Sequence, residues 1–302
     1  MKKLGSIVLK GLMKILAAIP LGAAYRLSSF IKWLMKDLLH YRRDVVMTNL
    51  ARSFPEKRYN EISNICDEFY NHLAELIVEA IWYGGCDSKR FNNAGILKVI
   101  NPELTAELIE KSPSVMVMFA HTGNWELIGG FEACNNAGDN GGYNSDNMTV
   151  VYRRLSSKIW DDFMRVNRFA TVEKKNYDIA YVESKNIMRF VLRHRNEKRF
   201  YFMNTDQRPY FKGSDNINVN FMGQRCRTMS GAATLAHKLG MAVCYMSMKR
   251  EARGHYNAEF VPICDNAAEM EPQQIMDRYY AMVESDIRQE PENYLWSHKR
   301  WQ

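Results

Sequence analysis

The sequence lacks the cysteine spacings that mark a zinc site or a redox pair. The chain has 302 residues and six cysteines, but no two of them form a Cys-x-x-Cys pair, and none has a histidine-rich partner segment. Scattered thiols of this kind argue against a structural zinc site and are typical of a reduced protein facing the cytosol. The cysteines are Cys66, Cys86, Cys134, Cys226, Cys244 and Cys264. We therefore predict no metal.

Motifs of several other protein classes are also missing. Ser230 and Ser247 have no Gly-x-Ser-x-Gly sequence around them, which counts against a serine hydrolase. The chain has no nucleotide-binding glycine fingerprint and none of the homeodomain, zinc-finger or RNP-type patterns of nucleic-acid-binding proteins. Its basic residues are spread along the chain instead of forming a readout helix. We therefore predict no cofactor and no nucleic-acid partner.

Long uncharged stretches are missing near the N-terminus. Lys10, Lys14 and Arg26 interrupt the apolar residues there, so no uncharged run reaches the length of about 18 expected of a membrane-spanning helix. The apolar core and cleavage site of a signal peptide are also poorly matched. The basic, amphipathic segment that remains predicts a helix lying in the membrane interface, with its lysines at the headgroups. A helical hairpin packed on the core is the alternative.

The composition supports a large folded core and a preference for anionic partners. Hydrophobic residues make up 46% of the chain, enough for one large domain or for one domain with an N-terminal appendage. The formal net charge of +7 favours an anionic lipid, an acidic carrier protein or a nucleic acid as partner. Charge alone does not choose among them, and the missing nucleic-acid motifs favour the first two.

The chain divides into a helical region, residues 1–95, and a longer mixed region, residues 96–302. The first has helical periodicity, longest over 61–83. In the second, strand-like and helix-like segments alternate, which predicts an α/β fold with a mainly parallel central sheet flanked by helices. The predicted strands are 115–120, 148–152, 200–204 and 241–248, with 217–221 and 256–261 as edge pieces. The predicted helices are 157–170, 184–194, 230–239 and 272–288.

A histidine follows the predicted strand 115–120 in an abrupt turn. The segment from His121 to Glu126 reads His-Thr-Gly-Asn-Trp-Glu, so His121 should lie at the C-terminal edge of the sheet, where open α/β sheets bind ligands. A neutral imidazole can take a proton from a hydroxyl if a carboxylate holds its other nitrogen. Glu126 is the nearest carboxylate, but a regular helix would separate residues five apart, so a distorted first turn must bring them together. An ordinary strand-to-helix corner is the alternative.

Further polar residues follow other predicted strands at the same edge. Arg153 could pair there with a phosphate or a carboxylate, or could begin the next helix in contact with solvent. Asp206 and Gln207 end another strand-like run, where Asp206 could contact a ligand or cap a turn. Gly223 could permit a close approach of the backbone to a ligand, and a plain turn explains it equally well.

Ordered motifs along most of the chain resemble one family. The segment 121–126 resembles the His-x4-Asp/Glu motif of the lysophospholipid acyltransferase superfamily, and its Asn-Trp-Glu ending is similar to the lipid A biosynthesis acyltransferase branch. The other segments similar to this branch are 41–46, 49–50, 53–56, 151–153, 206–207, 221–223, 231–236 and 291–301. Departures are a Gly/Asn-rich insertion at 136–147 and Asp-Gln-Arg at 206–208, where the family frequently has Asp-Gln-Asp.

This resemblance implies an acyltransferase that moves a fatty acyl group to a hydroxyl of a lipid A precursor. The donor would be acyl carrier protein or acyl-CoA, and the location would be the cytoplasmic face of the inner membrane. His121 would be the general base, oriented by Glu126, and backbone N–H groups near 122–124 or Arg153 would hold the oxyanion. The implied substrate-binding residues are Asn124, Arg153, Arg168, Asp206, Gln207 and Gly223.

Two other interpretations remain open at this point. The first keeps the chemistry and changes the acceptor to a lysophospholipid, a glycerophosphate or an aminolipid. The second is a non-catalytic membrane-binding protein in which the histidine turn is only scaffold. The sequence leaves the acyl chain length and the oligomeric state open.

Overall fold

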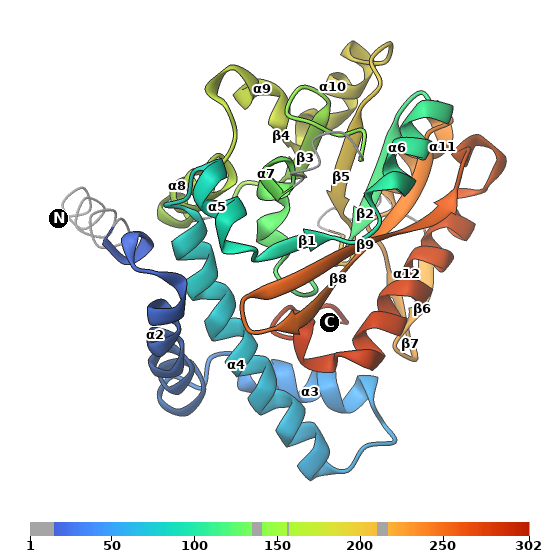
Figure 1. Cartoon of the computed structure of the whole chain (residues 1–302). Coiled ribbons are helices and arrows are strands. Elements are labelled where there is room, and N and C mark those ends of the chain that lie inside the picture. The colour runs from blue at the N-terminus through green and yellow to red at the C-terminus, as the bar shows by residue number, and fades with distance from the viewer. Residues whose placement is uncertain (1–14, 135–140, 156, 210–216, 302) are drawn as a thin grey trace.

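The computed structural model describes residues 15–134, 141–155, 157–209 and 217–301 of the chain. A central sheet is covered by helices on both faces, and the N-terminal helices pack along one side of the molecule (Figure 1). This is the predicted α/β fold with a mainly parallel sheet. The predicted division at residues 95 and 96 stays a prediction.

The helices fall into an N-terminal group and a group that alternates with the strands. The first group is α2 (Leu21–Trp33), the π-helical η1 (Leu34–Leu38), α3 (Arg43–Ser53), α4 (Tyr59–Tyr83) and α5 (Ser88–Ala94). The longer helices of the second group are α6 (Pro102–Lys111), α8 (Lys158–Arg168), α10 (Ile187–Arg193), α11 (Gly231–Leu239) and α12 (Pro272–Gln289). The short ones are η2 (Trp125–Gly130), α7 (Phe131–Cys134), η3 (Lys174–Asn176), α9 (Tyr177–Ala180), η4 (Ser184–Asn186), η5 (Ala267–Glu269) and η6 (Pro291–Asn293).

In the described part of the chain, seven strands form the main sheet in the order β1-β9-β8-β2-β5-β3-β4, and only the β8–β9 pair in it is antiparallel. These strands are β1 (Leu97–Val99), β2 (Val115–Phe119), β3 (Met148–Tyr152), β4 (Tyr181–Glu183), β5 (Phe200–Asn204), β8 (Ala242–Ala252) and β9 (His255–Cys264). A separate hairpin pairs β6 (Asn218–Phe221) with β7 (Gln224–Arg227).

The central strands are buried on both faces, as expected of a parallel sheet between helix layers. All five residues of β2 are buried, and they alternate between two hydrophobic clusters. Met116 and Met118 pack with α11 and α12, whereas Val115 and Val117 pack with α6 and α7 on the other face. The run Val-Met-Val-Met-Phe is apolar without interruption because both of its faces lie in the core.

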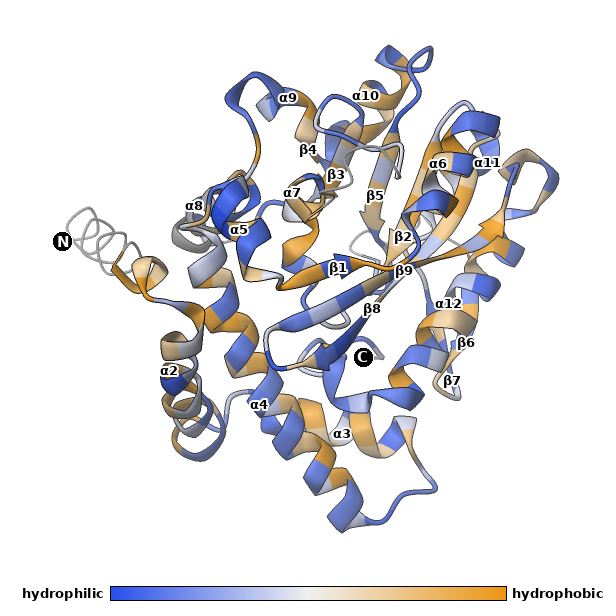
Figure 2. Ribbon diagram, viewed as in Figure 1, coloured by the Kyte–Doolittle hydropathy of each residue, from blue (hydrophilic) through white to orange (hydrophobic). Residues whose placement is uncertain are grey.

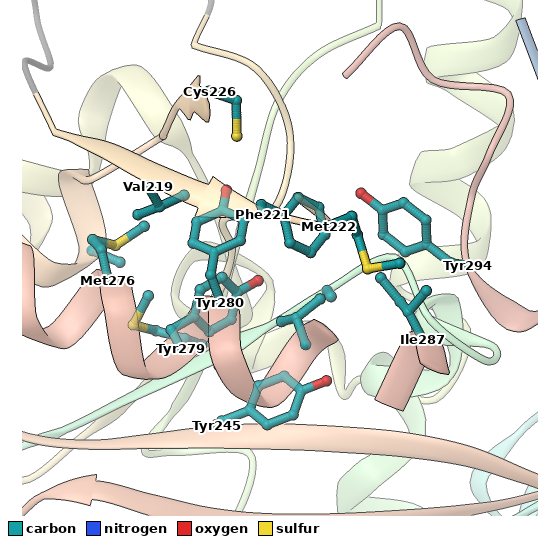
Figure 3. Packing of buried hydrophobic residues seen from close by; sticks show 14 of the residues in the cluster. Val219, Phe221, Met222, Cys226, Tyr245, Met276, Tyr279, Tyr280, Ile287 and Tyr294 are labelled. Carbon is teal, nitrogen blue, oxygen red and sulfur yellow. The ribbon is translucent and has the colours of Figure 1, made fainter. Parts of the chain in front are cut away.

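The β6–β7 hairpin packs on α12 through an aromatic cluster (Figure 3). The Phe221 ring lies 4.9 Å from the Tyr280 ring, 6.2 Å from the Tyr294 ring and 5.5 Å from the Trp301 ring, measured between centroids. Both turn residues have positive φ, 52° at Met222 and 72° at Gly223, as a two-residue type I′ turn requires. The hairpin therefore packs against both α12 and the C-terminal segment.

The N-terminal helices attach to the rest of the fold through α4. Ala24 and Tyr25 of α2 pack on Val78 of α4, and the two helices lie side by side (Figure 1). Several large apolar side chains remain exposed on this segment, namely Ile15, Phe30, Trp33, Leu38, Leu39 and Tyr41. Within the described ranges, no helix combines the length and the apolarity that crossing a bilayer requires.

The strand predictions were correct for the long apolar runs and wrong in the position of the two edge pieces. The predicted strands 115–120, 148–152, 200–204 and 241–248 correspond to β2, β3, β5 and β8. The segment 256–261 lies in β9, which is not at the edge of the sheet, because the three-residue β1 pairs with it on its outer side. The segment 217–221 belongs to the separate hairpin.

Candidate active site

Two adjacent parallel strands bring His121 and Asp206 together. The register pairs Phe119 of β2 with Asn204 of β5, so each chain runs on two residues past the last pair to reach its polar side chain. His121 Nδ1 lies 2.7 Å from Asp206 Oδ1. Because both residues follow the carboxyl ends of their strands, this pair lies at the edge of the sheet where ligands bind in open α/β folds.

Asp206 is set up to remain a carboxylate. It is 1% exposed, and burial alone would raise its pKa. The charge and hydrogen bonds of His121, with a further contribution from Arg300, outweigh burial and hold the pKa of Asp206 below its ordinary value. An ionised Asp206 accepts a hydrogen bond from Nδ1–H, which leaves the Nε2 lone pair of His121 as the basic position.

Two further side chains fix the His121 ring. The side-chain amide of Gln207 lies 3.0 Å from Nε2, measured from the amide nitrogen, so it can donate to that lone pair. The Trp125 ring meets the imidazole edge to face, with centroids 5.0 Å apart and an interplanar angle of 71°. The base is therefore held by Gln207 at Nε2 and by the Trp125 ring, and a reacting hydroxyl at Nε2 has to replace the Gln207 contact.

Glu126 does not hold the Nδ1 position for which the sequence suggested it. Its carboxylate accepts a hydrogen bond of 3.1 Å from the indole N–H of Trp125, and Asp206 takes the place at Nδ1. Burial raises the pKa of Glu126, and the charges of Arg168 and His121 oppose that rise. The physical reason is the short 3-10 helix η2, which directs residue 126 toward Trp125 and Arg168.

The turn after His121 has little conformational freedom. Gly123 has φ +55°, and a Cβ at this position would lie 2.7 Å from the Met248 carbonyl oxygen, so only glycine fits between the turn and β8. The Gly123 N–H donates to the Asn293 carbonyl at 3.1 Å. This N–H, one of the predicted oxyanion donors, is therefore already engaged.

The Asn124 side chain is buried under the turn, where it meets a buried glutamate. It is 1% exposed and donates to Glu79 Oε2 at 2.7 Å. The same carboxylate accepts from Tyr256 at 2.8 Å and, through Oε1, from Tyr25 at 2.7 Å. Burial raises the pKa of Glu79 to about 7, although the three donors pull it down. The network links α2, α4 and β9 to the histidine turn.

The C-terminal segment completes the turn from the other side. Leu295 donates its N–H to the His121 carbonyl at 3.0 Å, and Thr122 forms an isolated antiparallel bridge with Tyr294. Asn49 of α3 donates to the Trp296 carbonyl at 2.8 Å and to the His298 carbonyl at 2.9 Å. The segment lies between α4 and α12 (Figure 1). The backbone around the base therefore depends on residues 293–298.

Arg300 and His298 also bear on the pair electrostatically. Arg300 is 2% exposed, and its Nη2 donates to Tyr280 Oη at 2.8 Å, while Nε and Nη1 have no hydrogen-bond partner among the described residues. The pKa of His298 is lowered to about 4 by burial, against the opposing charge of Asp206. His298 is therefore neutral near pH 7. The sequence placed both residues in a terminal motif but offered no sign that they lie near His121.

The remaining predicted residues are dispersed around this centre. Arg168 stacks on the Tyr152 ring, with Cζ 4.6 Å from its centroid, and its charge acts on Glu126. Arg153 is exposed directly after β3. Gly223 lies in the turn of the β6–β7 hairpin, where the turn itself accounts for it. Among the described residues no cluster of three or more His, Cys, Asp or Glu side chains has the arrangement of a metal site.

Comparison with known protein families gives a match that covers almost the whole chain. The family model described as bacterial lipid A biosynthesis acyltransferase matches residues 3–302. A comparison with curated proteins finds no match.

Proposed function

The chain belongs to the bacterial lipid A biosynthesis acyltransferase family, and from this premise we propose its donor, acceptor and mechanism. The family makes it an acyltransferase of lipid A biosynthesis. The proposed reaction moves a fatty acyl group from the thioester of an acyl carrier protein to a hydroxyl of a lipid A precursor. The observation that carries the mechanism is the 2.7 Å contact between His121 and Asp206 at the ligand-binding edge of the sheet.

In this mechanism His121 is the general base. Its Nε2 takes the proton of the acceptor hydroxyl as the oxygen attacks the thioester carbonyl carbon. The tetrahedral intermediate then collapses, the carbon–sulfur bond breaks, and the imidazolium returns the proton to the departing thiolate. Asp206 holds the Nδ1–H tautomer throughout and stabilises the imidazolium, as the carboxylate of a catalytic triad does.

Glu126 and Arg168 form the second charged group of the proposed site. Glu126 fixes the Trp125 indole that packs on the His121 ring. Arg168, which acts on Glu126, is proposed together with Arg153 to hold the anionic oxygen or a phosphate of the acceptor. The two arginines take the place of the Gly123 N–H as oxyanion donors, because that N–H already donates to the Asn293 carbonyl.

Two other predicted substrate contacts take different proposed roles. Gln207 donates to the Nε2 lone pair, where the acceptor hydroxyl must bind. We assign Gln207 to positioning that hydroxyl after the hydroxyl has displaced its amide from Nε2. Asn124 is buried against Glu79, and we assign it to holding the turn. Neither role requires a cofactor or a metal.

The N-terminal segment supports a location at the cytoplasmic face of the inner membrane. Phe30, Trp33, Leu38 and Leu39 are about half exposed or more, and Lys32 and Lys36 lie among them. Apolar side chains with interleaved lysines suit the interface of an anionic bilayer. A bound membrane would present the lipid acceptor to the enzyme.

The test compares lipid A and total lipids, by mass spectrometry, from cells with and without this protein. Complementation uses wild type and His121→Ala in parallel, with protein levels and folding checked. We expect lipid A to lose one acyl chain without the protein and to regain it only with wild type. Unchanged lipid A with an altered phospholipid or aminolipid would overturn the proposed acceptor, and full activity of a folded His121→Ala protein would overturn the base.

A further inference from the structure

A second exposed apolar patch lies away from the N-terminal segment. Met188 and Leu192 are 47% and 50% exposed, and they lie one helical turn apart on the outward face of α10. The inward face of the same helix, Phe190 and Val191, packs on the sheet. Leu155, which follows β3, is 44% exposed. Met188 and Leu192 are neighbours on one helix face, and adjoining exposed apolar side chains make this face a candidate contact surface.

The same face is basic. Between residues 183 and 199 the chain carries six Lys and Arg residues against two glutamates, and one of the six, Arg199, is buried and paired with Glu197. Arg189 and Arg193 are exposed one turn apart beside the two apolar residues, and neither forms an ion pair with any described residue. Glu183 is already shared between Arg154, at 3.2 Å, and Lys185, at 3.1 Å. The surface thus keeps unneutralised positive charge around an apolar centre.

The patch lies close to the catalytic edge of the sheet. Lys185 belongs to η4, which follows the carboxyl end of β4, and Arg154 follows the carboxyl end of β3. Strand β4 is three positions from β2 in the sheet, and neighbouring strands are about 4.8 Å apart, so this end of the patch is about 14 Å from the end of β2. A carrier-borne thioester on an extended phosphopantetheine arm can span that distance.

A membrane bound by the N-terminal helices would leave this patch uncovered. Helix α10 and helix α2 lie at well-separated ends of the molecule (Figure 1), and α10 carries both apolar and charged residues (Figure 2). A partner for α10 therefore has to come from solution, carry negative charge and offer small apolar contacts.

We propose that the outward face of η4 and α10 is the docking surface for the acidic carrier protein that delivers the acyl thioester. Arg189 and Arg193 pair with acidic side chains of the carrier, and Met188 and Leu192 form the apolar centre of the contact. This inference rests on the proposed acyl-transfer function and assigns its donor site. Electrostatic pairing of this kind acts mainly on encounter and falls with ionic strength.

The experiment uses the full chain and two donors that carry the same acyl group, acyl carrier protein and acyl-pantetheine. The test variant is Arg189→Glu/Arg193→Glu, and Met188→Ser/Leu192→Ser is a second variant that leaves the charge unchanged. The control is Lys98→Glu/Lys238→Glu, which reverses two exposed charges elsewhere, one of them on β1 at the opposite end of the sheet. Thermal unfolding of each protein checks that it is folded.

We expect the arginine variant to raise KM for the acyl carrier protein about tenfold or more, with kcat and the acyl-pantetheine rate unchanged. The serine variant should raise the same KM, and the control should leave it unchanged. An equal loss with both donors, an unchanged KM, or a loss of binding to anionic vesicles alone would overturn the docking surface. Failure of wild type with both donors would instead overturn the proposed function, and transfer from acyl-pantetheine but not from the carrier would overturn the carrier as donor and the docking surface with it.

Discussion

Asp206 and Glu126 lie near the same imidazole but act on it differently. Asp206 contacts Nδ1 directly, whereas Glu126 makes its hydrogen bond to Trp125 and interacts with the ring through charge. We expect Asp206→Asn to lower kcat by about 10³ to 10⁴, because an amide at Nδ1 favours the wrong tautomer. Glu126→Gln should cost less, roughly one to two orders of magnitude, since its amide can still contact the indole. Steady-state kinetics of both variants give the comparison.

The kinetics are interpretable only if both variants are folded, which circular dichroism and thermal unfolding establish. A larger loss in Glu126→Gln than in Asp206→Asn would reverse the roles assigned to the two carboxylates. It would return Glu126 to the orienting position that the sequence suggested.

Glu79 predicts a pH dependence of stability. Its pKa rises from 4.5 to about 7 in the folded protein, so between these values the folded state holds a proton that the unfolded chain has released. The stability linked to this group is therefore fully present below about pH 4.5 and is lost as the pH rises toward 7. Chemical unfolding across that range should show a steeper fall for wild type than for Glu79→Gln, by about 3 kcal/mol at most.

Equal slopes for the two proteins would mean that Glu79 is ionised throughout, in which case its three donors outweigh its burial. Tyr25→Phe serves as the matched variant, because it removes one donor to the carboxylate and keeps the ring. It should shift the titration of Glu79 upward.

At the scale of elements, one buried side chain of α3, that of Asn49, contacts two carbonyls of the C-terminal segment. Asn49→Ala removes the side-chain hydrogen bonds to the Trp296 and His298 carbonyls and leaves the Trp296 carbonyl without this donor, whereas the His298 carbonyl keeps the Arg300 N–H. We expect a loss of about 1 to 3 kcal/mol in the free energy of unfolding and a fall in kcat, because Leu295 also holds the His121 carbonyl. Denaturant unfolding and kinetics measure both effects.

The control for Asn49→Ala is Asn71→Ala, since Asn71 makes only an exposed hydrogen bond to Glu68 among those described. Asn71→Ala should change the free energy of unfolding and kcat little. A destabilised Asn49→Ala protein with normal kcat would mean that the segment supports the fold without supporting the base.

Long elements could be predicted from the sequence, and short ones could not. The strands β2, β3 and β5 are apolar runs because helices cover the sheet. Such runs can be recognised in the sequence. Strands β1 and β4 have three residues each, too few for a periodicity, and they exist because a longer neighbour pairs with them. Their existence is decided by tertiary contacts.

The candidate site was predicted in its parts but not in its pairing. The sequence indicates that His121 and Asp206 both follow buried strands. It does not indicate that β2 and β5 are neighbours with Phe119 opposite Asn204, and the contact between residues 85 apart depends on that register. Glu126 was favoured because it is near in sequence, which is a poor guide where the chain turns into a 3-10 helix.

At the scale of the whole molecule, the N-terminal segment predicts membrane binding through its exposed apolar residues. Phe30→Ser/Trp33→Ser should weaken binding to vesicles that contain anionic lipid several-fold, because it removes two aromatic side chains with exposed area. Vesicle co-sedimentation at two salt concentrations measures the effect. The control is Tyr59→Ser, at the start of α4, where one aromatic ring is 72% exposed.

Equal binding of the double variant and wild type would place the membrane contact outside this segment. Loss of binding in Tyr59→Ser would extend the contact to the start of α4.

The contact of residues 293–298 with the turn at His121 has a consequence for biosynthesis. A ribosome makes the histidine, its strand and Asp206 well before it makes the residues that hold the histidine's backbone. A growing chain that stops short of residue 290 has the base and its carboxylate but not the support that keeps them in register. We therefore expect acylating activity to begin only after residues 293–298 have left the ribosome, and we expect translation products that end before residue 290 to be inactive.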